Sequence, residues 1–151
     1  MSTAGGPYRR DRQKREDGML FGQEHVQRYV ETDGAQGHDW QGTTVLILTT
    51  TGRRSGTPRS TPLIYQRYGD LLLVVASNGG RDDPPQWYLN LLADPAVHVQ
   101  VKGDRFAARA RTAGPEEKPA MWRTMTAVWP AYDDYQRKTA REIPVVVLER
   151  V

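Results

Sequence analysis

Apolar residues along this 151-residue chain gather in short runs that are rich in β-branched side chains and bounded by glycine, proline or aspartate. Runs of this length and composition are typical of strands. LLLVVAS (71–77) is apolar almost without a break, which predicts a buried strand, whereas Pro62 within STPLIYQR (60–67) predicts an edge strand or a bulge. The predicted strands cover residues 43–50, 60–67, 71–77, 96–102, 105–113 and 143–151.

Helical patterns are short and lie between or before these runs. Val26, Tyr29 and Val30 have helical spacing, and Gly34 supplies a stop. Another helix is expected from Pro115, because the two glutamates after it favour the positive end of a helix, although Pro119 would disrupt it beyond the first turn. The predicted helices cover residues 22–33 and 86–93, a segment from residue 115 onward, and residues 131–140.

The order of these elements indicates the fold class. About six strands and three or four short helices are expected, hairpin connections dominate, and regular βαβ alternation is absent, which argues against a doubly wound parallel sheet. The pattern predicts a mainly β protein, a small antiparallel barrel with helices packed outside. Residues 1–18 are expected to be a flexible basic tail and residues 19–151 a single domain.

Composition excludes several kinds of chemistry. The chain has no cysteine, and its three histidines are far apart in sequence, so disulfides, thiolate nucleophiles and a metal site are not expected. No apolar run approaches the roughly 18 residues of a membrane helix, and the N-terminus lacks the apolar core of a secretory signal, so a cytoplasmic location is expected. The net charge of +3 favours anionic partners only weakly, because the first eighteen residues hold five basic and three acidic side chains.

The stretch TTTGRRSGTPRSTPL (49–63) carries the first candidate site. It places Arg53, Arg54 and Arg59 in a loop between two predicted strands, with Ser55 and no acidic residue. The Walker A spacing and a G-x-G-x-x-G motif are both absent. Arginine forks match phosphate and carboxylate groups, and glycine-containing turns present backbone N–H groups to anions. The loop is therefore either an anion site or a basic surface loop.

Two further clusters carry candidate ligand contacts. ASNGGRDDPP (76–85) follows the third strand, so Ser77 and Asn78 could bond polar cofactor atoms at the same barrel rim, with Trp87 near a ring system. In VWPAYDDYQ, Tyr132 and Tyr135 share a helical face, where they either cover a ligand or pack on the barrel. No activated nucleophile or carboxylate pair emerges, so a cofactor would carry the chemistry if the protein is an enzyme.

These motifs together resemble the deazaflavin-dependent nitroreductase family, over roughly residues 20–151 and in one order. The resemblance implies a split β-barrel that binds coenzyme F420, with the arginine loop at its phosphate and oligoglutamate tail. The implied cofactor-binding residues are Arg53, Arg54, Ser55, Arg59, Ser60, Pro62, Leu63, Ala76, Ser77, Asn78, Gln86, Trp87, Asn90 and Tyr132. The implied substrate-side residues are Tyr65, Trp129 and Tyr135. The family often has Lys at the position of Asn78 and Tyr at that of Trp129.

The activity that the resemblance implies is hydride transfer from reduced F420 to an electron-poor acceptor, an activated alkene, a quinone or a nitroaromatic. Tyr132 or Tyr135 is the expected catalytic residue, because a phenol can stabilise the negative charge that develops on the acceptor. An FMN-dependent split-barrel oxidoreductase and a non-catalytic F420 carrier remain alternatives. Nucleic-acid binding is not expected, since the basic residues cluster in one loop. A lipid quinone as acceptor would place the protein at the membrane periphery.

Overall fold

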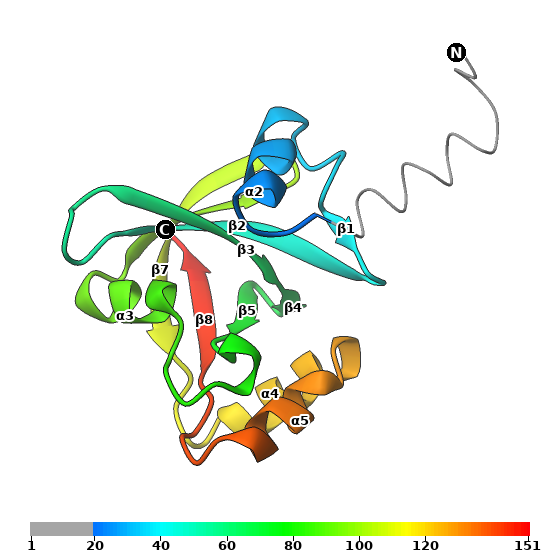
Figure 1. The fold of residues 1–151 in the computed structure, drawn as a ribbon, viewed down its shortest axis with the longest axis vertical. Helices are drawn as coiled ribbons and strands as arrows, with labels where there is room; N and C mark the ends of the chain where they lie inside the picture. The colour runs from blue at the N-terminus through cyan, green and yellow to red at the C-terminus, as the bar shows by residue number, and fades with distance from the viewer. Residues whose placement is uncertain (1–19) are drawn as a thin grey trace.

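Eight strands pair into one curled antiparallel sheet in the computed structural model, which describes residues 20–151 (Figure 1). The tail predicted for residues 1–18 lies outside the described residues. The strands are β1 (Asp39–Trp40), β2 (Thr43–Thr51), β3 (Pro58–Ile64), β4 (Gln66–Tyr68), β5 (Leu71–Val75), β6 (Ala96–Val101), β7 (Asp104–Thr112) and β8 (Val145–Arg150). Their order is β1-β2-β6-β7-β8-β5-β4, with β3 paired to β2 off this path. This is the predicted split-barrel class.

Helices surround the sheet (Figure 1). They are α2 (Gly22–Glu31), α3 (Gln86–Ala93), α4 (Lys118–Val128) and α5 (Ala131–Lys138), with the short 3₁₀ helix η1 (Asn78–Gly80) after β5. Figure 1 shows α2 beside β1 and β2, α4 and α5 at the opposite end of the molecule, and α3 at one side between these two ends.

Most predicted elements are present, with shifted boundaries. The run 60–67 is divided at Tyr65 into β3 and β4, and β1 was not expected, so eight strands stand where about six were predicted. The helix expected from Pro115 begins at Lys118, which places Pro119 in its first turn, where a proline is tolerated because it removes no helical hydrogen bond.

Successive side chains along the strands point to opposite faces of the sheet, and the buried ones form three hydrophobic clusters. Leu46 and Leu48 point into the barrel, while Val45 and Ile47 pack on the outside against α2. On β5, Leu73 and Val75 face outward in the same way and pack against α4 and α5, together with the fully buried Met125. Burial of both faces explains why these strands are apolar without a polar alternation.

The barrel is open along one edge of β3. Tyr65 N–H donates to the carbonyl of Thr44, and the register places Leu46 opposite Leu63, so residues 59, 61 and 63 direct their backbone groups toward β2. Pro62 lies between them, where a backbone N–H would face away from β2. No described strand pairs with this second edge, which confirms the prediction that Pro62 marks an edge strand.

Candidate functional site

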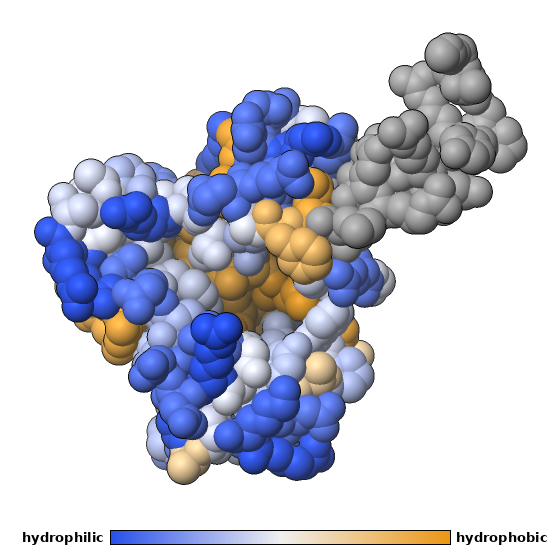
Figure 2. All heavy atoms as spheres, in the orientation of Figure 1, coloured by the Kyte–Doolittle hydropathy of each residue, from blue (hydrophilic) through white to orange (hydrophobic). Residues whose placement is uncertain are grey.

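A cavity of about 350 Å³ lies beside the open edge of β3. Figure 2 shows it as an apolar hollow between the part of the molecule that carries α2 and the part that carries α5. We call it the aromatic cavity. It is lined by Leu20, Phe21, Gly22, His25, Trp40, Val45, Thr61, Pro62, Leu63, Ile64, Val75, Ser77, Gly79, Trp129, Tyr132 and Tyr135.

A second hollow of about 470 Å³ follows the other half of β3 and is formed by the loop before it. We call it the arginine groove. It is lined by Gln23, Gly52, Arg53, Arg54, Ser55, Arg59, Ser60, Thr61, Gln86, Trp87 and Asn90. Thr61 lines both hollows, so the groove and the cavity meet on β3 and form one elongated site.

The loop that carries the arginines is held in a tight turn. Gly52 N–H donates to the carbonyl of Thr57 at 2.8 Å, and Gly56 N–H donates to the carbonyl of Gly52 at 2.8 Å. A Cβ on Gly52 would lie 2.6 Å from Ser55 Oγ, so a larger residue here would displace the hydroxyl group of Ser55. The hydroxyl groups of Ser55 and Thr57 lie 2.7 Å apart and are hydrogen-bonded to each other.

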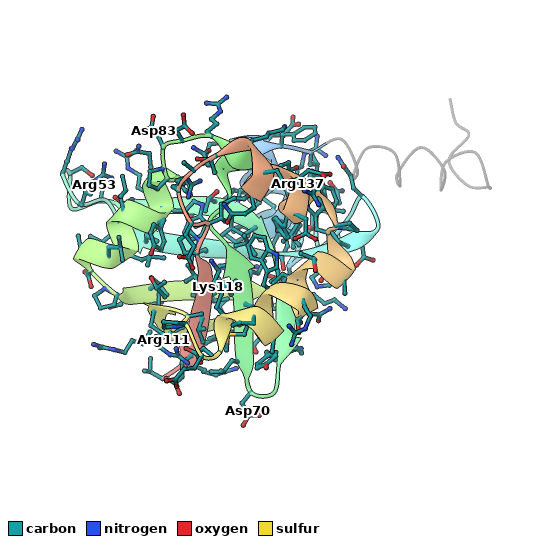
Figure 3. The ribbon with its side chains drawn as sticks, turned by 90° about the horizontal axis from the view of Figure 1, so that it is seen from below. Arg53, Asp70, Asp83, Arg111, Lys118 and Arg137 are labelled. Atoms are coloured by element: carbon teal, nitrogen blue, oxygen red, sulfur yellow. The ribbon has the colours of Figure 1, made fainter. Side chains whose placement is uncertain are left out.

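A buried amide fixes one of the three guanidinium groups. Asn90 on α3 is 5% exposed, and its Oδ1 accepts from both the backbone N–H of Arg53 at 3.2 Å and Arg53 Nη1 at 2.9 Å. Its Nδ2 donates to Thr50 Oγ1 at 3.2 Å, and Gln86 Oε1 accepts from Arg53 Nη2 at 2.8 Å. Arg53 is thus oriented by α3, at the periphery of the molecule and far from the β4–β5 turn that carries Asp70 (Figure 3).

No carboxylate among residues 20–151 pairs with the arginines of the loop. Among residues 20–151, the ion pairs of arginine are formed by Arg105, Arg111, Arg137 and Arg150, and none by the loop arginines. The side chains of Arg54 and Arg59 also make no hydrogen bond to residues 20–151. Exposed guanidinium groups without a carboxylate partner are free to bind an anion.

The side chain of Arg141 holds the segment that follows β5 in place by hydrogen bonds to its backbone carbonyl groups. Arg141 donates from Nε to the carbonyl of Arg81 at 2.9 Å, from Nη2 to that of Ser77 at 2.8 Å and from Nη1 to that of Ala76 at 3.3 Å. A Cβ on Gly80 would lie 2.8 Å from the carbonyl oxygen of Tyr135, so glycine lets this segment approach α5. The result places Ser77 at the wall of the aromatic cavity.

Two tyrosines of α5 line the aromatic cavity. Tyr132 is 5% exposed, and its hydroxyl group makes no hydrogen bond to residues 20–151. Burial, with a smaller contribution from neighbouring Tyr135, raises the pKa of Tyr132 well above its usual value, so its phenol stays protonated into the alkaline range. The ring of Tyr135 meets that of Tyr132 edge-on at 6.1 Å, and its hydroxyl group accepts from Trp129 Nε1 at 3.4 Å.

The structure brings most predicted site residues together. Those in the arginine groove are Arg53, Arg54, Ser55, Arg59, Ser60, Gln86, Trp87 and Asn90, and those in the aromatic cavity are Pro62, Leu63, Ser77, Trp129, Tyr132 and Tyr135. Ala76 is fully buried, and Asn78 lies outside both hollows, with its Nδ2 donating to the carbonyl of Asp83 at 2.9 Å.

Tyr65 lies apart from the site, unlike its predicted place on the substrate side. Thr61, Pro62, Leu63 and Ile64 line the cavity, whereas Tyr65, between β3 and β4, packs in the barrel core, where it is 6% exposed. Its hydroxyl group is hydrogen-bonded to His38 Nε2 at 2.9 Å, and His38 Nδ1 is hydrogen-bonded to Asp39 Oδ1 at 2.9 Å. Tyr65 therefore serves packing in this structure.

Sequence reasoning missed the wall that the N-terminal part of the domain contributes. Phe21, His25 and Trp40 line the aromatic cavity, and Thr61 joins the two hollows. Phe21 is 61% exposed, and a large apolar residue at a helix start was the signal available for it. The residues that the structure describes contain no group of three or more side chains that could hold a metal ion. Their helices also include none long and apolar enough to cross a membrane.

Comparisons with known proteins agree on one family. Residues 21–150 match the family model described as F420H(2)-dependent quinone reductase. An F420H(2)-dependent quinone reductase of Mycobacterium tuberculosis is 40% identical over 130 residues, which cover 83% of this chain and 87% of the relative. A solved F420-H2 dependent reductase is 37% identical with a TM-score of 0.65, covering 70% of this chain and 93% of its own. A second solved structure, described as a domain-swapped dimer, is 35% identical with a TM-score of 0.68, covering 83% of this chain and 95% of its own.

Proposed function

The chain belongs to the F420H(2)-dependent quinone reductase family, and we propose that it binds coenzyme F420 along β3 and reduces a quinone in the aromatic cavity. The predicted dependence on F420 is confirmed at the level of the family, while nitroaromatics and activated alkenes stay further predicted acceptors. One observation carries the proposal: a groove whose arginines form no ion pair with residues 20–151 and an apolar cavity meet at Thr61, on the edge of β3 that no described strand pairs with.

The arginine groove fits the anionic part of F420. This part consists of a phosphate and a tail of glutamate carboxylates, so it needs several positive groups that the protein has not already paired. Arg54 and Arg59 meet this requirement, and Arg53 adds a guanidinium group whose position Asn90 fixes in advance. A charge-assisted hydrogen bond is worth about 1.5–3 kcal/mol, and preorganisation lowers the entropy cost of forming it.

The aromatic cavity fits a planar ring system. Pro62, Leu63 and Ile64 supply an apolar wall from β3, and Tyr132 and Tyr135 face it from α5. Ser77 and the carbonyl groups on the open edge of β3 are the polar groups that could orient the ring. Mostly apolar lining with a few polar atoms is the usual composition of a cofactor site.

Bound reduced F420 would supply a hydride, and this hydride together with one proton would reduce a quinone to the hydroquinone. The contribution of the chain is to orient the rings and to exclude water. Tyr132 is protonated at neutral pH, as an ordinary tyrosine is, and burial raises its pKa further, so its hydroxyl group can donate a hydrogen bond to the oxygen on which negative charge develops. Tyr135 supports this position from the same face of α5.

Two titrations and one kinetic assay test the proposal. The purified protein is titrated with F420 and with FMN, and the oxidation of reduced F420 is followed with a naphthoquinone as acceptor. We expect F420 to bind more tightly than FMN, because its tail presents more negative charges to the arginine groove. Tight FMN binding without F420 binding would instead favour the FMN-dependent alternative. F420 binding without oxidation by any quinone, nitroaromatic or activated alkene would favour a carrier.

A further inference from the structure

Another hollow, of about 470 Å³, lies on the outer face of the sheet, across β3, β2, β6 and β7 and beside α2. We call it the outer hollow. Its polar lining consists of Thr49, Ser60, His98, Gln100 and Arg105. Ser60 also lines the arginine groove, so the groove and the outer hollow meet at this residue of β3.

The strand register places these side chains in two neighbouring rows. Thr49 on β2 lies opposite Ser60 on β3 and opposite His98 on β6. Gln100 is two residues from His98 along β6, and it lies opposite Arg105 on β7. Residues directly opposite each other in an antiparallel sheet share a face, as do residues two apart on one strand. A polar path therefore begins at the arginine groove and continues across the outer face toward β7.

The amide group of Gln100 has an acceptor that the protein does not use. Gln100 is 6% exposed, and its Nε2 donates to the carbonyl of Lys102 at 2.8 Å, which fixes the orientation of the amide. Its Oε1 accepts no hydrogen bond from residues 20–151. No fully buried side-chain oxygen of these residues lacks a partner, so Gln100 Oε1 reaches the surface, and the outer hollow is the surface that Gln100 lines.

Donor groups complete the outer hollow. The hydroxyl groups of Thr49 and Ser60 lie 2.7 Å apart, so one donates to the other and the proton of the second remains for a ligand. Arg105 is held by its Nη2, which donates to Asp33 Oδ1 at 2.9 Å and to the carbonyl of Val30 at 3.2 Å. Its Nε and Nη1 make no hydrogen bond to residues 20–151. Because Asp33 balances the charge of Arg105, this residue contributes positioned N–H groups rather than net charge.

Amide-linked glutamates match this set of groups. Each glutamate of the F420 tail adds an amide N–H, an amide carbonyl and a carboxylate. The N–H fits Gln100 Oε1, the carbonyl fits the remaining hydroxyl proton, and the carboxylate fits the free N–H groups of Arg105. A phosphate group or a lone carboxylate has no N–H, so it would leave the acceptor of Gln100 unused.

We propose that the outer hollow is a subsite for the distal glutamates of the F420 tail, which leaves the arginine groove over Ser60. The inference rests on the proposed function, because F420 bound in the arginine groove is what brings the tail to Ser60. It deepens that function by giving the far end of the tail a binding site of its own, on strands that carry none of the sequence motifs.

Titration with oxidised F420 that carries one to six glutamates tests the subsite without turnover. We expect the wild type to bind the six-glutamate form about tenfold more tightly than the one-glutamate form, as one or two added hydrogen bonds would give. Gln100→Met keeps an unbranched side chain and removes the acceptor, so this factor should fall to about threefold or less. His98→Glu places a negative charge at an exposed position of the outer hollow, where it repels the tail carboxylates, and should lower the factor similarly. Because His98 is exposed, this variant tests the subsite even if Gln100→Met does not fold.

Ala127→Glu is the control for charge, because Ala127 is an exposed residue of α4, which lies at the opposite end of the molecule from α2 (Figure 1). It should keep the wild-type factor between the two forms. The same factor in folded Gln100→Met and His98→Glu would overturn the inference, since longer tails would then bind through their charge alone. One affinity for all tail lengths in the wild type would also overturn it, while the proposed binding of F420 would stand. If no form of F420 binds, the proposed function itself is wrong, and this inference with it.

Discussion

Replacing Asn90 by alanine removes the residue that ties the arginine loop to α3. Three hydrogen bonds disappear with its amide, two from Arg53 and one to Thr50. In wild type the guanidinium group of Arg53 is held at two points, by Asn90 and by Gln86, and the substitution leaves only the exposed one. We therefore expect two separate effects, on stability and on the affinity for F420.

The stability effect follows from the buried position of Asn90, which is 5% exposed. An unsatisfied buried polar group costs about 1–3 kcal/mol, and the lost side-chain atoms leave a small cavity, so the total is about 2–4 kcal/mol. A domain of this size loses about 2–4 °C in Tm per kcal/mol, which predicts a decrease of roughly 5–15 °C. The affinity effect is about tenfold, or about 1.4 kcal/mol, because Arg53 must then be ordered when F420 binds.

Asn90→Asp separates the two effects. A carboxylate at this position still accepts both hydrogen bonds from Arg53, and it pairs the guanidinium group electrostatically, so the protein should lose less stability than with alanine. The same negative charge should lower F420 affinity at least as much, about 10- to 100-fold, because it neutralises one cation of the groove. High salt should reduce the loss, since screening weakens the repulsion between the new carboxylate and the anion.

Thermal unfolding by circular dichroism and F420 titration at low and high salt measure both quantities. Gln27→Ala is the matched control, because Gln27 is an exposed amide whose Nε2 donates to Glu31 on the same helix. It should change stability by no more than about 0.5 kcal/mol and leave binding unchanged. If Asn90→Ala keeps the wild-type Tm and the wild-type F420 affinity, the reasoning that Asn90 orients Arg53 is refuted.

Three further predictions concern the loop and the cavity. Arg54→Ala should weaken F420 binding about 10- to 100-fold with Arg54→Lys in between, and a salt titration should show the defect shrinking at high salt; wild-type affinity in Arg54→Ala would mean a merely basic loop. Tyr132→Phe should lower kcat more than F420 affinity. Burial raises the folded-state pKa of Tyr132, so the stability that the protonated phenol contributes is present below about pH 10 and is lost as the pH rises above it. Tyr132→Phe should therefore show a smaller decline in unfolding free energy at alkaline pH than wild type. Identical declines in the two proteins would contradict this. Gly52→Ala should lower Tm and F420 affinity, since its Cβ would lie 2.6 Å from Ser55 Oγ. Gly103→Ala, with no atom closer than 3.7 Å, should change neither the Tm nor the affinity. Equal Tm values of the two variants in a melting assay would exclude the clash.

Local patterns predicted the parts of this protein that depend on local physics. The strand from Thr43 and the helix QWYLNLLA follow from apolar runs and flanking prolines, and both appear where expected. The three arginines were also visible, because an acid-free loop between strands is a local feature. The catalytic and substrate roles of Tyr132, Tyr135 and Trp129 stay predictions, now with all three side chains in one cavity.

What the sequence could not show depends on contacts between distant segments. Asn90 meets Arg53 across 37 residues, and Arg141 reaches the carbonyl of Ser77 across 64 residues. Nothing in the neighbourhood of either residue marks its partner. Tyr65 shows the same limit, because its hydroxyl group is hydrogen-bonded in the barrel core to His38, 27 residues away in sequence.

The open edge of β3 also explains why the site can exist without making the protein prone to strand pairing. An unpaired strand edge normally invites another strand, because its N–H and carbonyl groups are unsatisfied. Here Pro62 supplies no N–H to that edge, and Gln23 from α2 donates to the carbonyl of Ser60 at 3.0 Å. Two of the positions that a foreign strand would use are thus blocked within the chain. A flat ligand that needs few backbone hydrogen bonds can still lie along this edge of β3. Pro62 and the hydrogen bond from Gln23 therefore protect β3 from pairing and also leave room for a cofactor between the arginine groove and the aromatic cavity.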